Sequence, residues 1–164
     1  MASGYMQPKD IDGSATASGF EKWIPMVEIN IQGLREVQSG GFAQQSSTRM
    51  TGGTQLKICA KLIMDKSYPK LMKAQLGGEP VAEIKAAITQ QVKGKEEKIA
   101  EVELKNVILT KVDAFTTEEK PNPFVYVELM PTEAKFTFTE FDDEKGSKKG
   151  DVAATYSAKE NKAS

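Results

Sequence analysis

Apolar and polar residues alternate at every second position along most of the chain. A period of two is typical of β-strands that have one face in a core and the other in solvent. It predicts four strands whose inward faces are Val27, Ile29 and Ile31; Leu56, Ile58, Ala60, Leu62 and Met64; Ala82, Ile84, Ala86 and Ile88; and Ala100, Val102 and Leu104. Further strands are expected at 124–130 and 134–141, around Pro131-Thr132, and at 152–156, with a short strand and loop within 1–19.

The alternation slips by one residue at Asn106, after which Val107 and Leu109 hold the apolar positions. Such a slip is typical of a β-bulge, which bends a strand as closure of a barrel requires. The polar stretches 93–98 and 142–150 are predicted to be hairpin loops.

One segment has a helical pattern instead. Ser67 is expected to cap the first-turn amides, and Pro69 suits a first turn, where its missing amide costs nothing. Gly77 can take the left-handed conformation that ends a helix. One face is formed by four residues about a turn apart, namely Tyr68, Leu71, Met72 and Leu76.

These patterns predict a mainly β fold. We expect an antiparallel β-barrel or sandwich with one short flanking helix at about 67–76 and a long extended loop at 33–53. No repeat and no linker divides the sequence, so 1–164 is expected to form a single domain with a polar tail at about 157–164.

Composition narrows the classes of function. With 39% apolar and 27% charged residues, neither disorder nor a membrane protein is favoured, and no stretch approaches the roughly 18 apolar residues of a membrane span. The net charge of −1 comes from acidic and basic residues mixed along the sequence. Nucleic acid and insertion into a membrane are therefore not expected.

The chemistry of catalysis is poorly represented. The chain has no histidine, which removes His-based nucleophile activation and zinc sites, and Cys59 is its single cysteine. Pairs such as Glu101 and Glu103, or Asp142 and Asp143, are better explained as solvated side chains than as a glycosidase site. No glycine pair continues into a phosphate-binding motif. We expect no enzyme activity, no cofactor and no metal.

The N-terminal residues 1–20 lack a basic stretch followed by an apolar run, so no secretory signal peptide is expected. A single cysteine fits folding in the reducing cytoplasm. If the protein leaves the cell, a dedicated machine is needed.

The loop at 33–53 is the most unusual feature. It is long, rich in glycine, glutamine, serine and threonine, and contains both arginines of the chain. Arginine is favoured at protein interfaces because its planar donors bind carboxylates. The plain alternative is a solvated hairpin tip. The candidate contacts with a neighbouring subunit or ring are Arg35, Gly40, Gly41, Arg49, Thr51 and Gly52.

Four blocks of sequence resemble the Hcp (haemolysin-coregulated protein) family of type VI secretion systems. The most specific is the block from Met64 to Ala74, Met-Asp-Lys-Ser-Tyr-Pro-Lys-Leu-Met-Lys-Ala, followed by Gly77-Gly78-Glu79, in which a strand ends and a short helix begins. The others are Lys9-Asp10-Ile11-Asp12-Gly13-Ser14, the strand at 104–112 and the C-terminal strand at 151–156.

This resemblance implies a non-enzymatic tube subunit that forms hexameric rings. The rings would stack into a tube that a contractile sheath expels, with a spike at its tip and small effectors in its lumen. The subunit would be made in the cytoplasm and secreted by the type VI machine.

Two alternatives remain at this point. A phage or phage-derived tail-tube protein has the same mechanics, and genes for a sheath or for a capsid nearby would separate the two. A small-ligand β-barrel of the lipocalin kind predicts a monomer with an aromatic-lined mouth, which light scattering would test.

Overall fold

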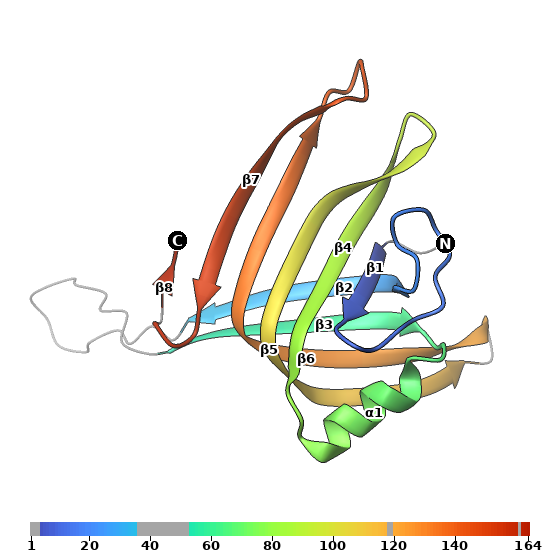
Figure 1. Ribbon diagram of the computed structural model, residues 1–164, viewed down its shortest axis with the longest axis vertical. Coiled ribbons are helices and arrows are strands. Elements are labelled where there is room, and N and C mark those ends of the chain that lie inside the picture. Colours follow the sequence, from blue (N-terminus) through green and yellow to red (C-terminus); the bar gives the residue numbers. More distant parts are fainter. Residues whose placement is uncertain (1–3, 36–52, 118–119, 161) are drawn as a thin grey trace, which may run out of the picture.

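The computed structural model describes residues 4–35, 53–117, 120–160 and 162–164, which contain eight strands and one helix (Figure 1). The strands are β1 (Gly4–Pro8), β2 (Ile24–Arg35), β3 (Thr54–Ile63), β4 (Val81–Val92), β5 (Lys95–Thr117), β6 (Lys120–Phe141), β7 (Lys148–Ser157) and β8 (Lys162–Ala163). The helix α1 (Tyr68–Gly77) lies between β3 and β4. The predicted fold, mainly β with one short helix, is confirmed.

All strand pairs are antiparallel, and six strands close into a barrel. The order is β3-β2-β1-β4-β5-β6, and an additional pairing between β3 and β6 completes the ring. β7 pairs with β6 outside this ring, and β8 pairs with β7. The hydrophobic alternation therefore led to the correct architecture, because each barrel strand must present one face to a common core.

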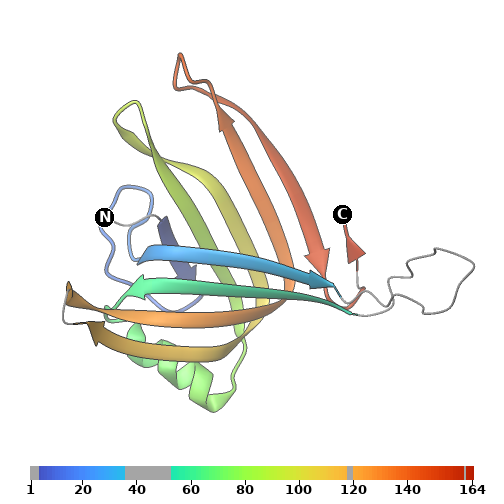
Figure 2. The same cartoon turned by 180° about the vertical axis from the view of Figure 1, so that it is seen from behind.

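β5 and β6 belong to two sheets at once. The short sheet consists of β2, β3, the first half of β6 and the second half of β5. The long sheet consists of β1, β4, the first half of β5, the second half of β6, β7 and β8. Figure 2 shows β2 and β3 crossing in front of the lower part of the long sheet, whose upper part has no facing strand among the described residues.

The core lies between the two sheets. In β3 the predicted inward residues Leu56, Ile58, Ala60 and Leu62 are all buried. In β4, Ile84 and Ala86 are buried as expected, but Ala82 is exposed. The largest fully buried side chains come from six strands and the helix: Met6, Ile24, Met26, Ile58, Leu62, Leu71, Ile84, Leu104, Val107, Val125, Val127 and Leu129.

The inward face predicted for β2 is partly wrong. Ile24 and Met26 are fully buried, and the register to β3 shifts between Met26 and Glu28. The shift makes Val27 the extra residue of a bulge, after which Ile29 packs against the core. Alternation alone could not locate this shift, because Val27 is apolar and extends the pattern of Ile29 by one step.

At Asn106 the predicted change of face is real, but no register shift occurs there. Asn106 has a φ of +47°, a left-handed conformation that asparagine tolerates better than most residues. Before it Val102 and Leu104 are buried, and after it Val107 and Leu109. The ladder shifts farther along, between Leu109 and Lys111 and between Phe115 and Thr117.

The opposite strand changes face at the same level. In β6, Leu129 is buried before the bend and Ala134 is buried after it. Pro131, between them, pairs with Val107 of β5. The two strands predicted around Pro131-Thr132 are therefore one continuous strand. Since both strands turn together, their pairing is preserved while the sheet bends from the long into the short sheet.

The helix begins as predicted but is held differently. The Ser67 side chain makes no cap to the first turn; its hydroxyl and its amide both donate to Asp65 Oδ1. Pro69 lies in the first turn, and the left-handed stop is Gly78 rather than Gly77. Leu71 is buried, but Leu76 is exposed, so the predicted apolar face is shorter than expected.

Two other boundaries also differ from the prediction. The loop at 33–53 is too wide at its start, because β2 continues through Gly33 to Arg35. The polar tail at 157–164 is not purely a tail, because Lys162 and Ala163 pair with β7.

The turn Lys93-Gly94 is a two-residue hairpin with positive φ at both positions, which suits the twist of the flanking strands.

Two glycines lie where no side chain fits. A Cβ on Gly4 would lie 2.1 Å from the carbonyl oxygen of Ala87, and one on Gly13 would lie 2.3 Å from that of Trp23. Gly4 belongs to β1, and Gly13 to the loop that returns to β2. At both positions the backbone of the N-terminal segment packs directly against the backbone of a neighbouring segment.

Candidate assembly surface

Of the predicted interface residues, the structure describes Arg35, which lies at one end of the short sheet. Arg35 is the last residue of β2 and pairs with Thr54, the first residue of β3. Gly40, Gly41, Arg49, Thr51 and Gly52 lie outside the described residues. The geometry of the predicted interface is therefore defined only at Arg35.

Arg35 borders an apolar hollow of about 370 Å³. Ile31 and Leu34 of β2 contribute to it, together with Phe136 of β6 and Tyr156 of β7. The Tyr156 hydroxyl donates to the carbonyl oxygen of Thr54 and accepts from its side-chain hydroxyl, each at 3.1 Å. These bonds connect the two sheets across the hollow. Tyr156 was not predicted as a site residue, because its only signal in the sequence was its place at the end of a strand.

From this hollow an apolar strip extends along the long sheet. Phe136 and Phe138 in β6 pair with Ala154 and Val152 in β7, and all four lie on the face that continues the core. Phe136 packs against the core, but Phe138 is 51% exposed and Val152 is 68% exposed. The strip therefore lies on the face of the sheet that forms the core elsewhere, but none of the described residues covers Phe138 and Val152. The sequence shows apolar residues of the strip at every second position, but it does not show that no other layer packs on them.

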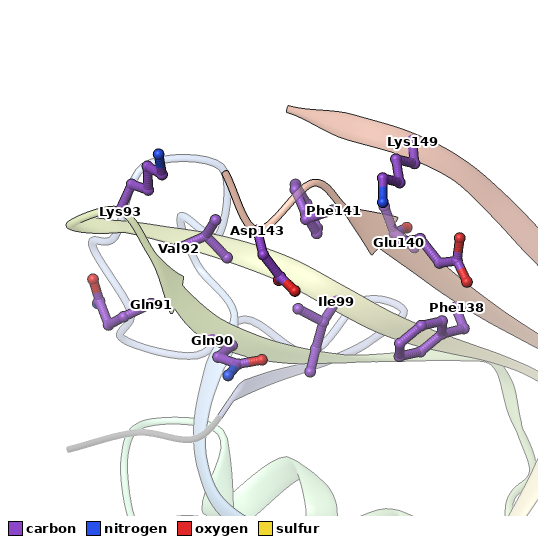
Figure 3. A pocket seen from close by; sticks show the side chains of 11 residues that line it. Gln90, Gln91, Val92, Lys93, Ile99, Phe138, Glu140, Phe141, Asp143 and Lys149 are labelled. Carbon is purple, nitrogen blue, oxygen red and sulfur yellow. The ribbon is translucent and has the colours of Figure 1, made fainter. Parts of the chain in front are cut away.

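The strip ends in a groove between the tips of the β4–β5 and β6–β7 hairpins (Figure 3). The groove has a volume of about 490 Å³. Its apolar lining comes from Val92, Ile99, Phe138 and Phe141. Lys93 Nζ donates to the backbone carbonyl of Glu144, so the two tips contact one another.

On the other side of the sheet, Glu96 accepts from Tyr5 and Thr89, which holds the β4–β5 hairpin to β1.

The short sheet has two incompletely paired edges. β1 pairs with β2 only at 24–26, so residues 28–34 have β3 on one side and no described strand on the other. β4 pairs with β5 only as far as Val107, so residues 108–113 have β6 alone among the described strands. These edges lie on opposite sides of the sheet. Exposed edges of this kind are templates for pairing with another chain.

The outer face of the long sheet is polar and locally neutral. Across β4, β5 and β6, Lys85 faces Glu103, Glu103 faces Lys135, and Lys105 faces Glu133. Lys85 Nζ lies 3.9 Å from Glu103 Oε1 and 3.5 Å from Glu83 Oε1. Such exposed pairs stabilise little, but they leave the face without a strong field of either sign.

The outer face of the short sheet carries the cysteine. Cys59 is half-buried beside Tyr126, whose hydroxyl donates to Glu128 Oε1 at 3.4 Å. A hydrogen bond with Cys59, burial and the nearby Glu128 carboxylate raise the pKa of Tyr126 well above its ordinary value. The phenol is therefore neutral at physiological pH. Lys57 pairs with Glu128 at 3.4 Å, so this face is also polar with compensated charges.

Within the described ranges, no three His, Cys, Asp or Glu side chains gather closely enough to hold a metal ion. Among the same residues, no helix has the length and hydropathy needed to cross a membrane.

A family model described as "Type VI secretion system effector, Hcp" matches residues 5–142. The chain belongs to the Hcp family. Hcp proteins are structural tube proteins that the type VI secretion machinery exports, so this chain is a type VI tube or effector protein. A comparison with curated protein sequences finds no match.

Solved structures support the Hcp fold. One, described as a type six secretion system protein, has a TM-score of 0.86 at 18% identity, with all of both chains covered. Hcp1 from Salmonella typhimurium gives 0.76 at 16% identity, again over all of both chains. A type VI secretion system effector from Yersinia pestis gives 0.68 at 16% identity, covering 94% of this chain and 98% of that one.

Two of the blocks that resemble Hcp meet in space. Asp65, from the strand-to-helix block, accepts the Ser67 amide on Oδ1 at 2.9 Å and the Ser14 amide on Oδ2 at 2.8 Å. Ser14 belongs to the N-terminal block, and Lys70 Nζ reaches the carbonyl oxygen of Asp10 in the same block at 3.4 Å. One carboxylate thus fixes the N-terminal loop against the start of α1, which gives the two blocks of this Hcp chain a shared structural role.

Proposed function

We propose that the chain is the ring-forming subunit of a type VI inner tube. Six copies form a ring, rings stack into a tube, and a contractile sheath expels the tube with a spike at its tip and small effectors in its lumen. The role is mechanical rather than catalytic. The observation that carries the proposal is the uncovered apolar strip at Phe138 and Val152, which continues the core of the barrel.

Burial of this strip favours association. Exposed apolar surface gains roughly 25 cal/mol per Å² when it is removed from water. A contiguous apolar face on a soluble chain is typical of a binding surface. The edge at 28–34 borders the hollow where the strip begins, and the edge at 108–113 lies on the opposite side of the short sheet. Different surfaces on opposite sides of the subunit favour head-to-tail contact, which closes into a ring when the rotation between copies permits.

Stacking of rings is assigned to the loop at 33–53. Its described start, Arg35, borders the hollow at the end of the short sheet, away from the hairpin tips. We infer that Arg35 and Arg49 bind acidic side chains of an adjacent copy. Gly40, Gly41 and Gly52 permit conformations closed to other residues, and the Thr51 hydroxyl pairs with backbone groups of the neighbour.

Assembly is tested by measuring the size of the purified full chain. Light scattering over a range of concentrations is expected to show a species of about six subunits, and negative-stain images are expected to show rings. A protein that stays monomeric at high concentration, with no rings in the images, contradicts the proposal.

The stacking role is tested separately with Arg49→Glu. Rings are expected to form normally, because the substitution lies outside the barrel strands, whereas tubes and export are expected to be reduced. Thermal unfolding of the variant is the control for the fold. If tubes and export match the wild type, the loop has no docking role.

A further inference from the structure

Two large apolar side chains at distant points of the described chain are mostly in water. Leu76, in the last turn of α1, is 75% exposed, and Phe138, in the groove between the hairpin tips, is 51% exposed. Both views of the fold place α1 and the hairpin tips at opposite ends of the molecule (Figures 1 and 2). The two side chains therefore cannot meet within one copy, but they can meet between copies arranged head to tail.

The groove suits a helix end in size and chemistry. Its volume of about 490 Å³ lies within the range of roughly 300–1,000 Å³ typical of sites that enclose a ligand. The floor is formed by Phe138 and Ile99, which come from the neighbouring strands β6 and β5 (Figure 3). Such a floor can accept one large apolar side chain together with the turn that carries it.

Charged side chains of both signs lie beside both surfaces. Lys73 precedes Leu76 by three residues and Glu79 follows it by three, so a cation and an anion flank the leucine. The rim of the groove contains Glu140 and Asp143 as anions, and Lys93 and Lys149 as cations. Each charge beside Leu76 can therefore face an opposite charge on the rim, and rim pairs of this kind set orientation and exclude wrong partners.

We propose that the groove between the β4–β5 and β6–β7 hairpins receives the end of α1 from a second copy, with its Leu76 against Phe138. This contact rests on the proposed ring assembly and names the surfaces that build it. Each copy offers a groove at one end and a helix at the other, so every contact in a ring is the same and none is left over once the ring closes.

Covalent trapping tests the contact directly. In a Cys59→Ser background, which removes the native thiol, Leu76→Cys and Phe138→Cys are combined and treated with a short bis-maleimide. Denaturing gels are expected to show a ladder that ends at the ring size. The matched control combines Leu76→Cys with Lys135→Cys, which lies on the same strand as Phe138 but on the opposite face, and is expected to remain largely monomeric.

A charge exchange gives a second test that does not depend on thiols. Leu76→Asp alone and Phe138→Lys alone are each expected to weaken association at least tenfold. Thermal unfolding of dilute, unassembled protein is expected to change little, because much of each side chain is exposed. Combining them is expected to recover much of the loss, since the new charges are opposite. Lys135→Asp is the control and is expected to associate as the wild type does.

The outcomes separate the contact from the function. Wild-type rings without a trapped ladder, or single variants that assemble normally, overturn the contact and leave the ring intact. A wild type that remains monomeric at high concentration overturns the proposed function and the contact together.

Discussion

In the barrel, β5 presents Val102 and Leu104 to a core from which water is excluded, and Leu104 has no exposed surface. Beyond the barrel, on the face that continues this core, β6 presents Phe138 and β7 presents Val152, and both are mostly in water. The two regions share a strand pattern and differ only in whether another layer covers them. The contrast teaches that alternation identifies the face that continues the core, but not whether another layer covers that face.

The largest difference is expected between Leu104→Ala and Phe138→Ala. Deleting a buried leucine typically costs about 2–5 kcal/mol of unfolding free energy, and a cost in that range is expected here because its neighbours cannot fill the cavity. Phe138→Ala removes a side chain that is half in water, so it is expected to cost less than about 1 kcal/mol in the monomer. Chemical denaturation of dilute protein measures both. Equal costs would show that the projecting sheet is as well packed as the barrel.

The helix offers the same contrast within ten residues. Leu71 is buried against the barrel, so Leu71→Ala is expected to lower stability by about 2–5 kcal/mol. Leu76→Ala is expected to change it by less than about 0.5 kcal/mol, because most of that side chain is already in water. Thermal unfolding compares the two variants. An unchanged midpoint for Leu71→Ala would contradict the packing of α1 on the barrel.

Two glycines allow the same comparison between a packed and an open position of the backbone. A Cβ at Gly4 meets the Ala87 carbonyl at 2.1 Å, so Gly4→Ala is expected to cost roughly 1–3 kcal/mol through displacement of β1 or β4. A Cβ at Gly33 would have open space within 4 Å, and Gly33→Ala is expected to be neutral or to stabilise by up to about 1 kcal/mol. Urea unfolding of the two variants measures both changes in unfolding free energy. A tolerated Gly4→Ala would mean that the barrel can widen there.

The smallest effect is expected at Asp151, in the projecting part of β7. Lys148 Nζ at 2.9 Å and the Thr139 hydroxyl at 2.7 Å lower the pKa of Asp151 below its ordinary value of 3.8. A lowered pKa in the folded state contributes stability above pH 3.8, and this contribution is lost as the pH falls through the folded value. Asp151→Asn is therefore expected to unfold at slightly lower temperature at neutral pH and to lose part of the acid sensitivity.

Melting curves between neutral pH and about pH 3 check this prediction. Lys148→Met, which removes the partner cation, is expected to act in the same direction. If both variants follow the wild-type pH profile, the ion pair contributes nothing measurable, as is common for exposed pairs.

The sequence predicted what depends on local pattern. Leu56, Ile58, Ala60 and Leu62 followed the alternation because β3 is regular and lies in the barrel wall. The face of β2 was misassigned because the shift at Val27 is set by its partner strand. Ser67 was interpreted as a cap because nothing local shows that its hydroxyl donates to Asp65.

The candidate site was less predictable for the same reason. Phe138 and Val152 lie at a spacing typical of a buried face, but whether another layer covers them depends on the tertiary arrangement. The bond between Tyr156 and Thr54 joins residues separated by 102 positions. The groove combines two hairpin tips that are far apart in the chain. Long-range geometry of this kind has no periodic signal.

The pairing between β3 and β6 also fixes when the protein can fold during its synthesis. Ile58 finds its partner Leu129 only after the ribosome has added the intervening segment, including α1, β4 and β5. Until then only five of the six barrel strands are present, and the edges of β3 and β5 stay open, a state prone to pair with the wrong chain. A chain interrupted before Phe124 cannot close at all. The time between the synthesis of β3 and that of β6 is therefore the period in which mispairing of the nascent chain is most favoured.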